Sequence, residues 1–435
     1  MKDLAKSGLG PLVTLLLFVI TLPILSRLYS PSDFAIWMYG SGLIFFAVSI
    51  STLRFDIAFL TEENASLINS LFWANVFIST FVLSVILICL YFFSRFIPIL
   101  GEIRHTDTYS FFLLWLIFAT HTFIWTLWNQ RGSNFLVISL VSTISVLVAV
   151  SIQIYGGFAQ SGGAYWLFLG SLIGKLLEGI FLMCWGLRKQ YRPAKPKLSM
   201  VDFLANLHRH KRCFYFSLPY TLVNFFKERS TIFILGFFAD IRIVGIYAQS
   251  LRICNAPAGI LGAIIRPVLL NKALKEGIRV LETPVNNLLW LIIFLSSPIL
   301  ALLAHLPPEF FGVLFGAEWE NIGPYIFWLS VPAAIFSISN WLDRLIELKK
   351  KHQWNFVLQV ITLLSSLAAL TSSLVYGAPI LVALMFQSII LSMNYCFHIY
   401  FFYRIVKFKS KVLLSMLLLA GAIYSVCDFL LDRIL

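Results

Sequence analysis

Long apolar runs, separated by short polar stretches, fill this chain from end to end. A run of about 18 or more apolar residues is long enough to cross a bilayer as a helix. The pattern therefore predicts an all-α polytopic membrane protein, with twelve spanning helices near residues 8–28, 34–53, 69–93, 109–129, 134–154, 163–187, 214–238, 242–270, 285–306, 324–346, 354–375 and 379–403. A thirteenth apolar run, at 412–430, either crosses as an extra C-terminal helix or lies along the membrane surface.

The composition agrees with this interpretation. The chain is 59% hydrophobic and 12% charged, whereas soluble domains carry about 25% charged residues. The six cysteines are scattered without paired spacing, so we expect no disulfide framework and no metal site. Residues 1–28 end without a small-residue cleavage pattern, and we expect a retained first helix rather than a signal peptide.

The distribution of lysine and arginine predicts the topology. With the N-terminus in the cytoplasm and alternating spans, 23 Lys and Arg residues fall in inner segments, five in outer segments and five within spans. Cytoplasmic loops carry an excess of such residues in membrane proteins. The net charge of +13 is then explained by this bias and by anionic membrane lipids, and we expect no nucleic-acid partner.

The chain divides in the middle, at a basic, proline-containing stretch. Residues 188–213 separate six predicted spans from six and form a connector that either lies on the inner membrane surface or is a solvated linker. Three pairs of similar positions, at offsets of 208, 210 and 212 residues, indicate a parallel duplication. We therefore expect two six-helix bundles, at 1–187 and 214–403, around a central cavity, with a basic segment and apolar helix at 404–435.

One predicted span is unusually charged. Ser217–Gly236 is apolar enough to cross, yet Lys227, Glu228 and Arg229 lie in its middle. A charge at the bilayer centre costs about 2.5 kcal/mol or more, so it normally faces a wet cavity or a partner. On a helix Arg229 points away from the other two, on the side of Phe225. We expect Lys227 to line a cavity, with Arg229 in reserve and Glu228 as a tuning partner. In the alternative interpretation the segment does not cross, or the charges pair only to hold the bundle.

Further charged residues lie in other predicted spans. Arg252 is near the middle of the eighth span and Arg266 nearer its inner end. Arg54 closes the second span, where it either faces the inner mouth of a cavity or extends to the lipid headgroups. Two uses are open for Lys175 and Glu178 in the sixth span. Their i, i+3 spacing favours mutual neutralisation, and the other use is tuning or ion coupling in the cavity.

The sequence lacks the motifs that are typical of several functional classes. There is no phosphate-binding Walker A motif, so we expect no ATP-driven transport by this chain. We find no carboxylate or histidine constellation for catalysis and expect a transporter, with no catalytic residues, rather than an enzyme. His121 and His398 stand alone in their spans, and we expect both to be hydrogen-bonded packing residues.

Five blocks of sequence resemble one family. They are Ser7–Trp37, Leu53–Ala65, Phe214–Asn224, Val244–Gly262 and Leu314–Ile326. In their order along the chain they resemble the O-antigen and capsule-unit flippases of the multidrug/oligosaccharidyl-lipid/polysaccharide exporter superfamily. The second block reads Leu-Arg-Phe-Asp where that family often has Leu-Arg-Tyr-Glu.

The resemblance implies a function. It implies alternating access in a bacterial cytoplasmic (inner) membrane, moving undecaprenyl-pyrophosphate-linked oligosaccharide to the outer leaflet. It implies no bound cofactor, a proton or sodium gradient in some members, and contacts with membrane lipids and with polysaccharide polymerase and assembly proteins. A cationic path would hold the pyrophosphate, and the candidates are Arg54, Lys227, Arg252 and Arg266, with Arg229 in reserve. The alternatives are an ion-coupled drug or lipid-II exporter, a membrane enzyme of glycan assembly, and a non-transporting scaffold.

Overall fold

The computed structural model describes residues 13, 17, 19–62, 64–93, 108–159, 163–188, 208–211, 213–348 and 352–409. Most of these residues are helical, and none of them is in a strand. The chain forms two compact units, Met1–Arg229 and Ser230–Leu435. Most of the predicted connector and the thirteenth apolar run at 412–430 lie outside the described residues, so the predicted domain bounds and the extra helix stay predictions.

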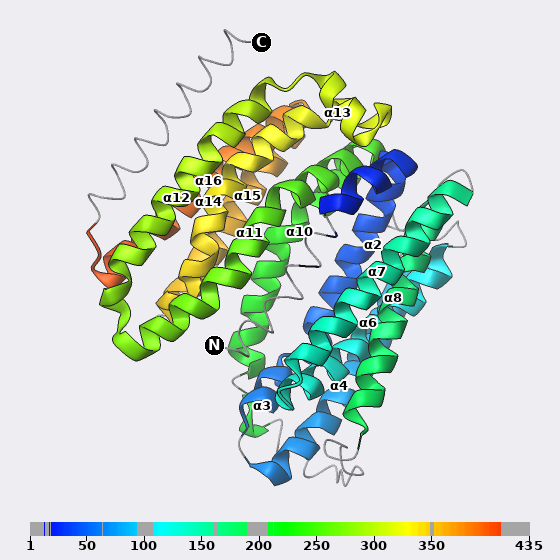
Figure 1. The fold of residues 1–435 in the computed structure, drawn as a ribbon, viewed down its shortest axis with the longest axis vertical. Helices are drawn as coiled ribbons and strands as arrows, with labels where there is room; N and C mark the ends of the chain where they lie inside the picture. Colours follow the sequence, from blue (N-terminus) through cyan, green and yellow to red (C-terminus); the bar gives the residue numbers. More distant parts are fainter. Residues whose placement is uncertain are drawn as a thin grey trace. The chain divides into compact units, whose positions relative to one another are not determined.

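The described helices of the first unit are drawn in blue to green in Figure 1, and the unit ends within a helix. A short helix over Val19–Leu28 is followed by α2 (Pro31–Ser51), α3 (Phe55–Thr61), α4 (Ala65–Phe93), α6 (Thr108–Arg131), α7 (Phe135–Ala159) and α8 (Ala164–Gly186). A π-helical turn, η1 (Cys213–Ser217), leads into α10 (Leu218–Phe238), and the unit boundary falls within that helix.

The start of α2 shows how the sequence determines a helix boundary. The Ser30 hydroxyl accepts a hydrogen bond from the Asp33 N–H at 3.2 Å, and the Asp33 carboxylate accepts one from the Ser30 N–H at 3.2 Å. This capping box satisfies two N–H groups that the first turn leaves without helical partners. The other Asp33 oxygen accepts from the Ala164 N–H at 2.9 Å. One carboxylate therefore joins the starts of α2 and α8.

Helix α8 packs closely on its neighbours through glycines. A Cβ atom added to Gly170 would lie 2.5 Å from the carbonyl oxygen of Ala149 on α7, and one added to Gly174 would lie 2.8 Å from that of Ser145. The two glycines are four residues apart, as in the Gly-x-x-x-Gly pattern that lets membrane helices approach closely. Small side chains on α8 thus bring the backbones of α7 and α8 into contact.

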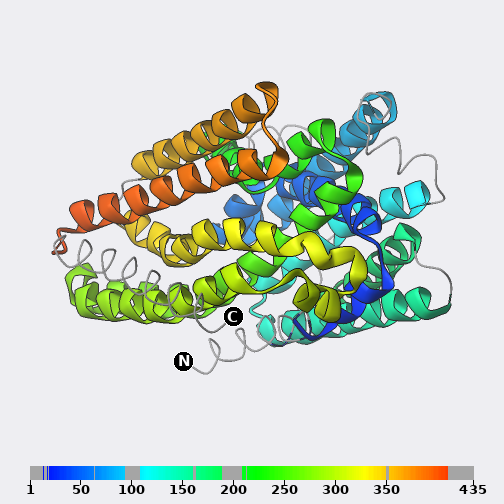
Figure 2. The same ribbon diagram turned by 90° about the horizontal axis from the view of Figure 1, so that it is seen from above.

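The second unit holds the rest of the described helices. They are the end of α10, α11 (Ile241–Glu276), η2 (Ile278–Leu281), α12 (Glu282–His305), α13 (Pro308–Phe315), η3 (Ala317–Ile322), α14 (Gly323–Leu348), α15 (His352–Val375) and α16 (Ile380–Val406). Helix α14 packs against α11 on one side and α16 on the other (Figure 2). A buried apolar core that includes Leu281, Leu289, Leu342 and Phe402 fills the space among α11, α12, α14 and α16.

The predicted spans coincide well with the observed helices. Nine described helices are long and apolar enough to cross a membrane, which confirms the all-α polytopic class. Helices α10 and α11 match the predicted seventh and eighth spans in position but do not belong to these nine, so their crossing stays a prediction. The short helices α3, α13 and η3 were not predicted; each buries aromatic side chains, such as Phe59, Phe311 and Trp319.

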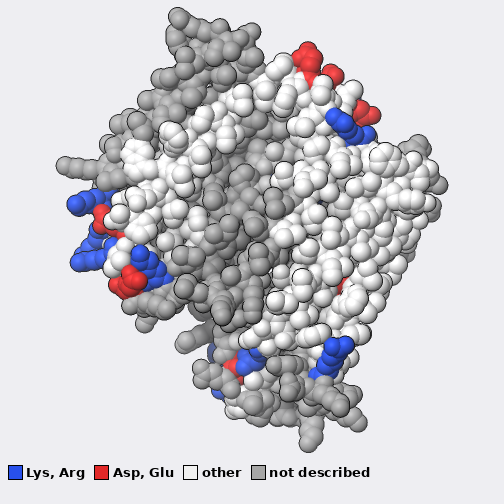
Figure 3. Space-filling view, in the orientation of Figure 1, with Lys and Arg blue, Asp and Glu red and all other residues white. Residues whose placement is uncertain are grey.

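Segments predicted to share a membrane side do contact one another. At one end of the first unit, Arg131 bonds to the backbone of Glu62. In the second unit, the Lys409 N–H bonds to Glu282 at one end, and Arg242 bonds to the backbone of Glu318 at the other. On the face shown in Figure 3, the visible Lys, Arg, Asp and Glu side chains of the described residues lie mostly near the edge. These contacts agree with the predicted grouping, whereas the cytoplasmic assignment of one side stays a prediction.

Candidate functional site

The turn between α2 and α3 has a strained backbone. Leu53 and Arg54 follow one another with φ angles of 47° and 67°, in the left-handed region. Non-glycine residues there cost about 1 kcal/mol or more each, and such strain persists only where the surroundings hold it. The turn places Arg54, a predicted site residue, directly before α3.

Polar residues around this turn are almost completely buried. The Thr52 hydroxyl donates to Asp56 Oδ1 at 2.8 Å. The Asn75 amide donates to the carbonyl oxygens of Phe55 at 3.4 Å and of Leu71 at 2.9 Å. Thr52, Asp56 and Asn75 are each at most 5% exposed. None of the three was predicted from the sequence as a site residue, although Asp56 follows Arg54 by two positions.

One donor of the Arg54 side chain is not satisfied by the described residues. Its Nη1 lies 3.7 Å from Asp56 Oδ2, a distance too long for a direct hydrogen bond. Its Nε is buried and has no hydrogen-bond partner among the described residues. A buried donor left in this way is unfavourable by about 1–3 kcal/mol. The geometry therefore suits an anion with several acceptor oxygens, such as a phosphate.

The far end of α3 is held by Arg131, from the end of α6. Its guanidinium donates to the carbonyl oxygens of Phe59 at 2.6 Å, of Leu60 at 3.0 Å and of Glu62. These are carbonyls that a helix C-terminus leaves without partners, and a cation there also interacts favourably with the helix dipole. The Arg131 guanidinium also lies 5.7 Å from the centre of the Phe59 ring. Arg131 thus fixes the position of the helix that follows Arg54.

A histidine before α10 also reaches this end of the unit. His210 Nε2 lies 3.5 Å from Glu62 Oε2, and both side chains are largely buried. The residues just after α3 are therefore in contact with both α6 and the segment that enters α10.

Arg229 faces α2. Its guanidinium carbon lies 5.9 Å from the centre of the Phe45 ring, and the Phe225 ring packs 4.8 Å from that of Phe46. Arg229 is thus on the side of Phe225, as the helical angles predicted. Phe45 is about 9 Å from the end of α2 at Ser51, at about 1.5 Å per residue. Arg229 therefore contacts α2 at Phe45, whereas Arg54 follows the end of the same helix. The two predicted cations lie at different positions along α2.

The other site residues predicted in the seventh and eighth spans lie on α10 and α11. Lys227 is partly buried and Glu228 is exposed on α10. Arg252 and Arg266 lie on α11 in the second unit. Arg252 is partly buried, and the side chain of Arg266 lies outside the described residues. Their role in a cationic path stays a prediction.

Lys175 and Glu178 do neutralise one another. Lys175 Nζ donates to Glu178 Oε2 at 2.6 Å. The Glu178 side chain is 9% exposed, whereas that of Lys175 is 42% exposed. The pairing favoured by the sequence is confirmed, and a tuning or ion-coupling role stays a prediction.

We expect Lys175→Met to lower the free energy of unfolding by about 1 kcal/mol, because it leaves the buried Glu178 carboxylate without its ammonium partner. The expected loss of stability is small, because water reaches the exposed Lys175 and weakens the ion pair. The double variant Lys175→Met/Glu178→Met removes both charges and should recover the loss. Thermal unfolding in detergent measures both; a double variant less stable than the single one would contradict the explanation.

The side chains of His121 and His398 are hydrogen-bonded, as predicted. His121 Nδ1 is 2.9 Å from the carbonyl oxygen of Ile117. His398 Nε2 is 3.0 Å from Thr362 Oγ1 and 3.3 Å from the carbonyl oxygen of Leu358. Because a carbonyl can only accept, Nε2 of His398 carries the hydrogen in this arrangement.

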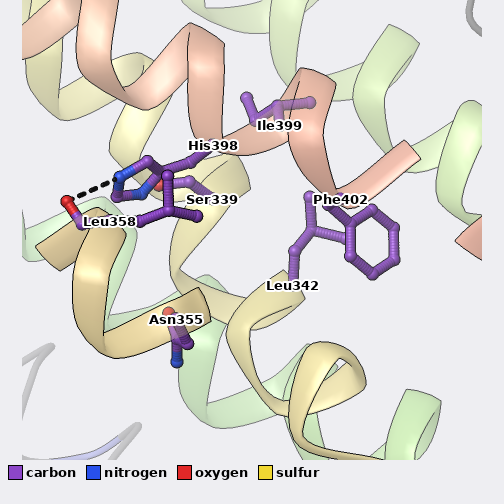
Figure 4. Close-up of a pocket in the computed structure, with 7 residues that line it drawn as sticks. All are labelled: Ser339, Leu342, Asn355, Leu358, His398, Ile399 and Phe402. Atoms are coloured by element: carbon purple, nitrogen blue, oxygen red, sulfur yellow. Dashed lines mark hydrogen bonds between the residues drawn. The ribbon is translucent and has the colours of Figure 1, made fainter. Parts of the chain in front are cut away.

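His398 lines a small pocket, with both polar and apolar lining residues, that was not predicted from the sequence. Its other lining residues come from α14, α15 and α16 and are Ser339, Leu342, Asn355, Leu358, Ile399 and Phe402 (Figure 4). On α15, four buried polar residues share one face, at Asn355, Gln359, Thr362 and Ser366. The polar residues are spaced by four, three and four positions, which follows the helix period. This spacing could have predicted a polar face on the helix from the sequence.

Within the described residues no group of three or more His, Cys, Asp or Glu side chains is placed to hold a metal ion. The polar clusters in this part of the chain offer mainly amide, hydroxyl and guanidinium groups.

Sequence comparison points to one family of proteins. The family model described as polysaccharide biosynthesis protein matches residues 24–324. A relative from Klebsiella pneumoniae, described as an uncharacterized membrane protein in the cps region, is 23% identical over 369 residues. That match covers 82% of this chain and 73% of the relative.

Solved transporter structures share the fold. The lipid II flippase MurJ, in an inward closed conformation, has a TM-score of 0.69 and 13% identity, and the match covers 99% of this chain and 97% of that one. A multidrug resistance MATE family transporter of the MOP superfamily, in an inward-facing conformation, has a TM-score of 0.66 and 11% identity, over 92% and 98%. The chain therefore has the fold of this transporter superfamily.

Proposed function

Because the chain belongs to the polysaccharide biosynthesis protein family, we propose that it is a flippase for lipid-linked glycan. Its substrate would be an undecaprenyl-pyrophosphate-linked oligosaccharide of O-antigen or capsule type, moved from the inner to the outer leaflet by alternating access. The relative from a cps region supports this choice of substrate class. A proton or sodium gradient would drive the cycle, and a polysaccharide polymerase would receive the product.

The observation that carries this proposal is the Arg54 guanidinium, which has a buried Nε without a hydrogen-bond partner among the described residues and a carboxylate only at 3.7 Å. A pyrophosphate cannot enter hydrocarbon without replacement of its hydration shell. A guanidinium supplies paired donors that match phosphate oxygens. Arg54 therefore has free binding capacity of the kind that the substrate needs.

The other cations extend this site into a path. In the proposal Lys227, Arg252 and Arg266 take over the pyrophosphate as the substrate advances, with Arg229 in reserve and Glu228 as a tuning partner. Long cationic side chains can follow a phosphate over several ångströms. The polyprenyl tail stays in lipid throughout, so only the head group requires a polar route.

We expect Arg54→Gln to lower the translocation rate about tenfold or more, since charge-assisted hydrogen bonds contribute about 1.5–3 kcal/mol each. The assay uses proteoliposomes that contain the purified chain and undecaprenyl-pyrophosphate-linked oligosaccharide, with a lectin that detects the sugar in the opposite leaflet. Arg188→Gln is the matched control, because Arg188 is an exposed arginine stacked on Trp185, 5.0 Å from its ring centre.

The same vesicles test the second candidate, export of a drug or of lipid II, which the shared fold with MATE and MurJ supports. A cationic dye and lipid II replace the oligosaccharide lipid in parallel samples. Transport of the dye or of lipid II, without transport of the oligosaccharide lipid, would reject the proposed function in favour of this candidate.

A further inference from the structure

We propose that Asp56 is an internal counterion that occupies Arg54 between transport events and competes with the phosphate of the substrate. The inference rests on the proposed function and adds a residue that sets the affinity for the anionic head group. Asp56 would not contact the substrate. It would act by holding the guanidinium that does.

The geometry of the pair is that of a weak, exchangeable contact. One Asp56 oxygen accepts from the Thr52 hydroxyl at 2.8 Å, and the other faces Arg54 at 3.7 Å. A direct N–H···O⁻ bond would be about 2.7–2.9 Å long. The Lys175–Glu178 pair in the same unit, at 2.6 Å, does form one. Arg54 is therefore held by charge attraction and not by a hydrogen bond to its carboxylate.

The two partners differ in freedom to move. Asp56 is 5% exposed and lies in the first turn of α3. Arg131 holds the far end of that helix, and Asn75 bonds to the carbonyl of Phe55 next to Asp56. The Arg54 side chain is 28% exposed. When the pair separates, the carboxylate stays in place and the guanidinium moves.

Separation leaves the carboxylate partly satisfied. Asp56 keeps the Thr52 hydroxyl bond, so its charge is not left without any donor. Arg54 exchanges a distant carboxylate for phosphate oxygens that can approach both edges of its guanidinium. The resting protein thus lowers its own affinity for the anion, and the carboxylate can reclaim Arg54 when the phosphate leaves. Such competition would favour release of the product.

The test measures binding of undecaprenyl pyrophosphate to the full-length protein in nanodiscs by thermophoresis. Four proteins form a cycle: wild type, Asp56→Asn, Arg54→Gln and the double variant. We expect Asp56→Asn to tighten binding about fivefold, since partly exposed ion pairs are weak. The gain should disappear in the Arg54→Gln background, because no guanidinium is left to release.

A second variant changes binding in the opposite direction. Thr52→Val removes the hydroxyl that holds one Asp56 oxygen, so the carboxylate is free to bind Arg54 more tightly. We expect binding of the lipid to weaken. Glu309→Gln, which removes an exposed carboxylate in the first turn of α13, is the control and should leave binding unchanged.

The outcomes separate the two proposals. A wild-type protein that does not bind the lipid overturns both the proposed function and the role of Asp56. Binding that weakens in Arg54→Gln but is not tightened by Asp56→Asn overturns the counterion role and leaves the function standing. If Asp56→Asn tightens lipid binding equally with and without Arg54, the counterion role is also overturned. The effect would then come from the removal of a negative charge and not from the release of Arg54.

Discussion

Replacement of Gly170 with alanine should lower the free energy of unfolding by about 2–3 kcal/mol, the upper part of the range of about 1–3 kcal/mol that is usual for an added group in a tightly packed interior. The new Cβ would lie 2.5 Å from the backbone carbonyl oxygen of Ala149, which cannot turn away as a side chain could. Helices α7 and α8 would have to separate. Thermal unfolding of the purified protein in detergent measures the effect.

Gly259 on α11 provides the matched control for this prediction. An added Cβ there would meet no atom of the described residues within 4 Å, so Gly259→Ala should be neutral or stabilising by up to about 1 kcal/mol through helix propensity. Opposite signs at the two glycines would establish close packing as the cause. Equal changes at both positions would show that helix propensity alone decides the outcome.

Arg131→Ala should be the second large effect. It removes three guanidinium bonds to carbonyls at the end of α3 and should lower the free energy of unfolding by about 3 kcal/mol, given about 1.5–3 kcal/mol for a bond to a charged group and partial replacement by water. Because α3 follows Arg54 directly, we also expect lipid translocation to fall more than tenfold.

The variant Arg131→Lys distinguishes charge from geometry. The lysine ammonium would keep a cation near the helix end but could not reach three carbonyls with a planar fork, so this variant should recover only part of the stability. Arg188→Ala, at the exposed end of α8, serves as the control and should change the unfolding midpoint little. Full recovery by lysine would mean that the helix dipole, and not the hydrogen bonds, holds α3.

The long helices were predictable because hydrophobic length decides them. The observed bounds of α4, at Ala65–Phe93, and α6, at Thr108–Arg131, lie within a few residues of the predicted spans. Bilayer thickness and helix rise leave little choice for an apolar run of this length. The short helix α3 escaped prediction, since seven residues carry too little periodic signal and its stability comes from contacts with α4 and α6.

The candidate site was predictable only in part. Arg54 and Arg229 were identified because a charge in an apolar run is conspicuous. Thr52 and Asn75 were missed, since single hydroxyl and amide groups are common in membrane helices. Whether such a hydroxyl or amide belongs to a site depends on which side chains it contacts in the folded chain. The bonds from Arg131 to α3 join residues about 70 positions apart, which no local pattern indicates.

The left-handed turn at Leu53–Arg54 sets backbone stability against the transport role proposed for Arg54. Glycine is the residue that adopts such a φ most easily, so a substitution of Arg54 by glycine relaxes the backbone and removes the guanidinium in the same step. Given the proposed role of Arg54, a search for more thermostable variants would favour that change and select proteins with impaired transport. Thermostabilisation of this chain for structural work should therefore hold position 54 fixed.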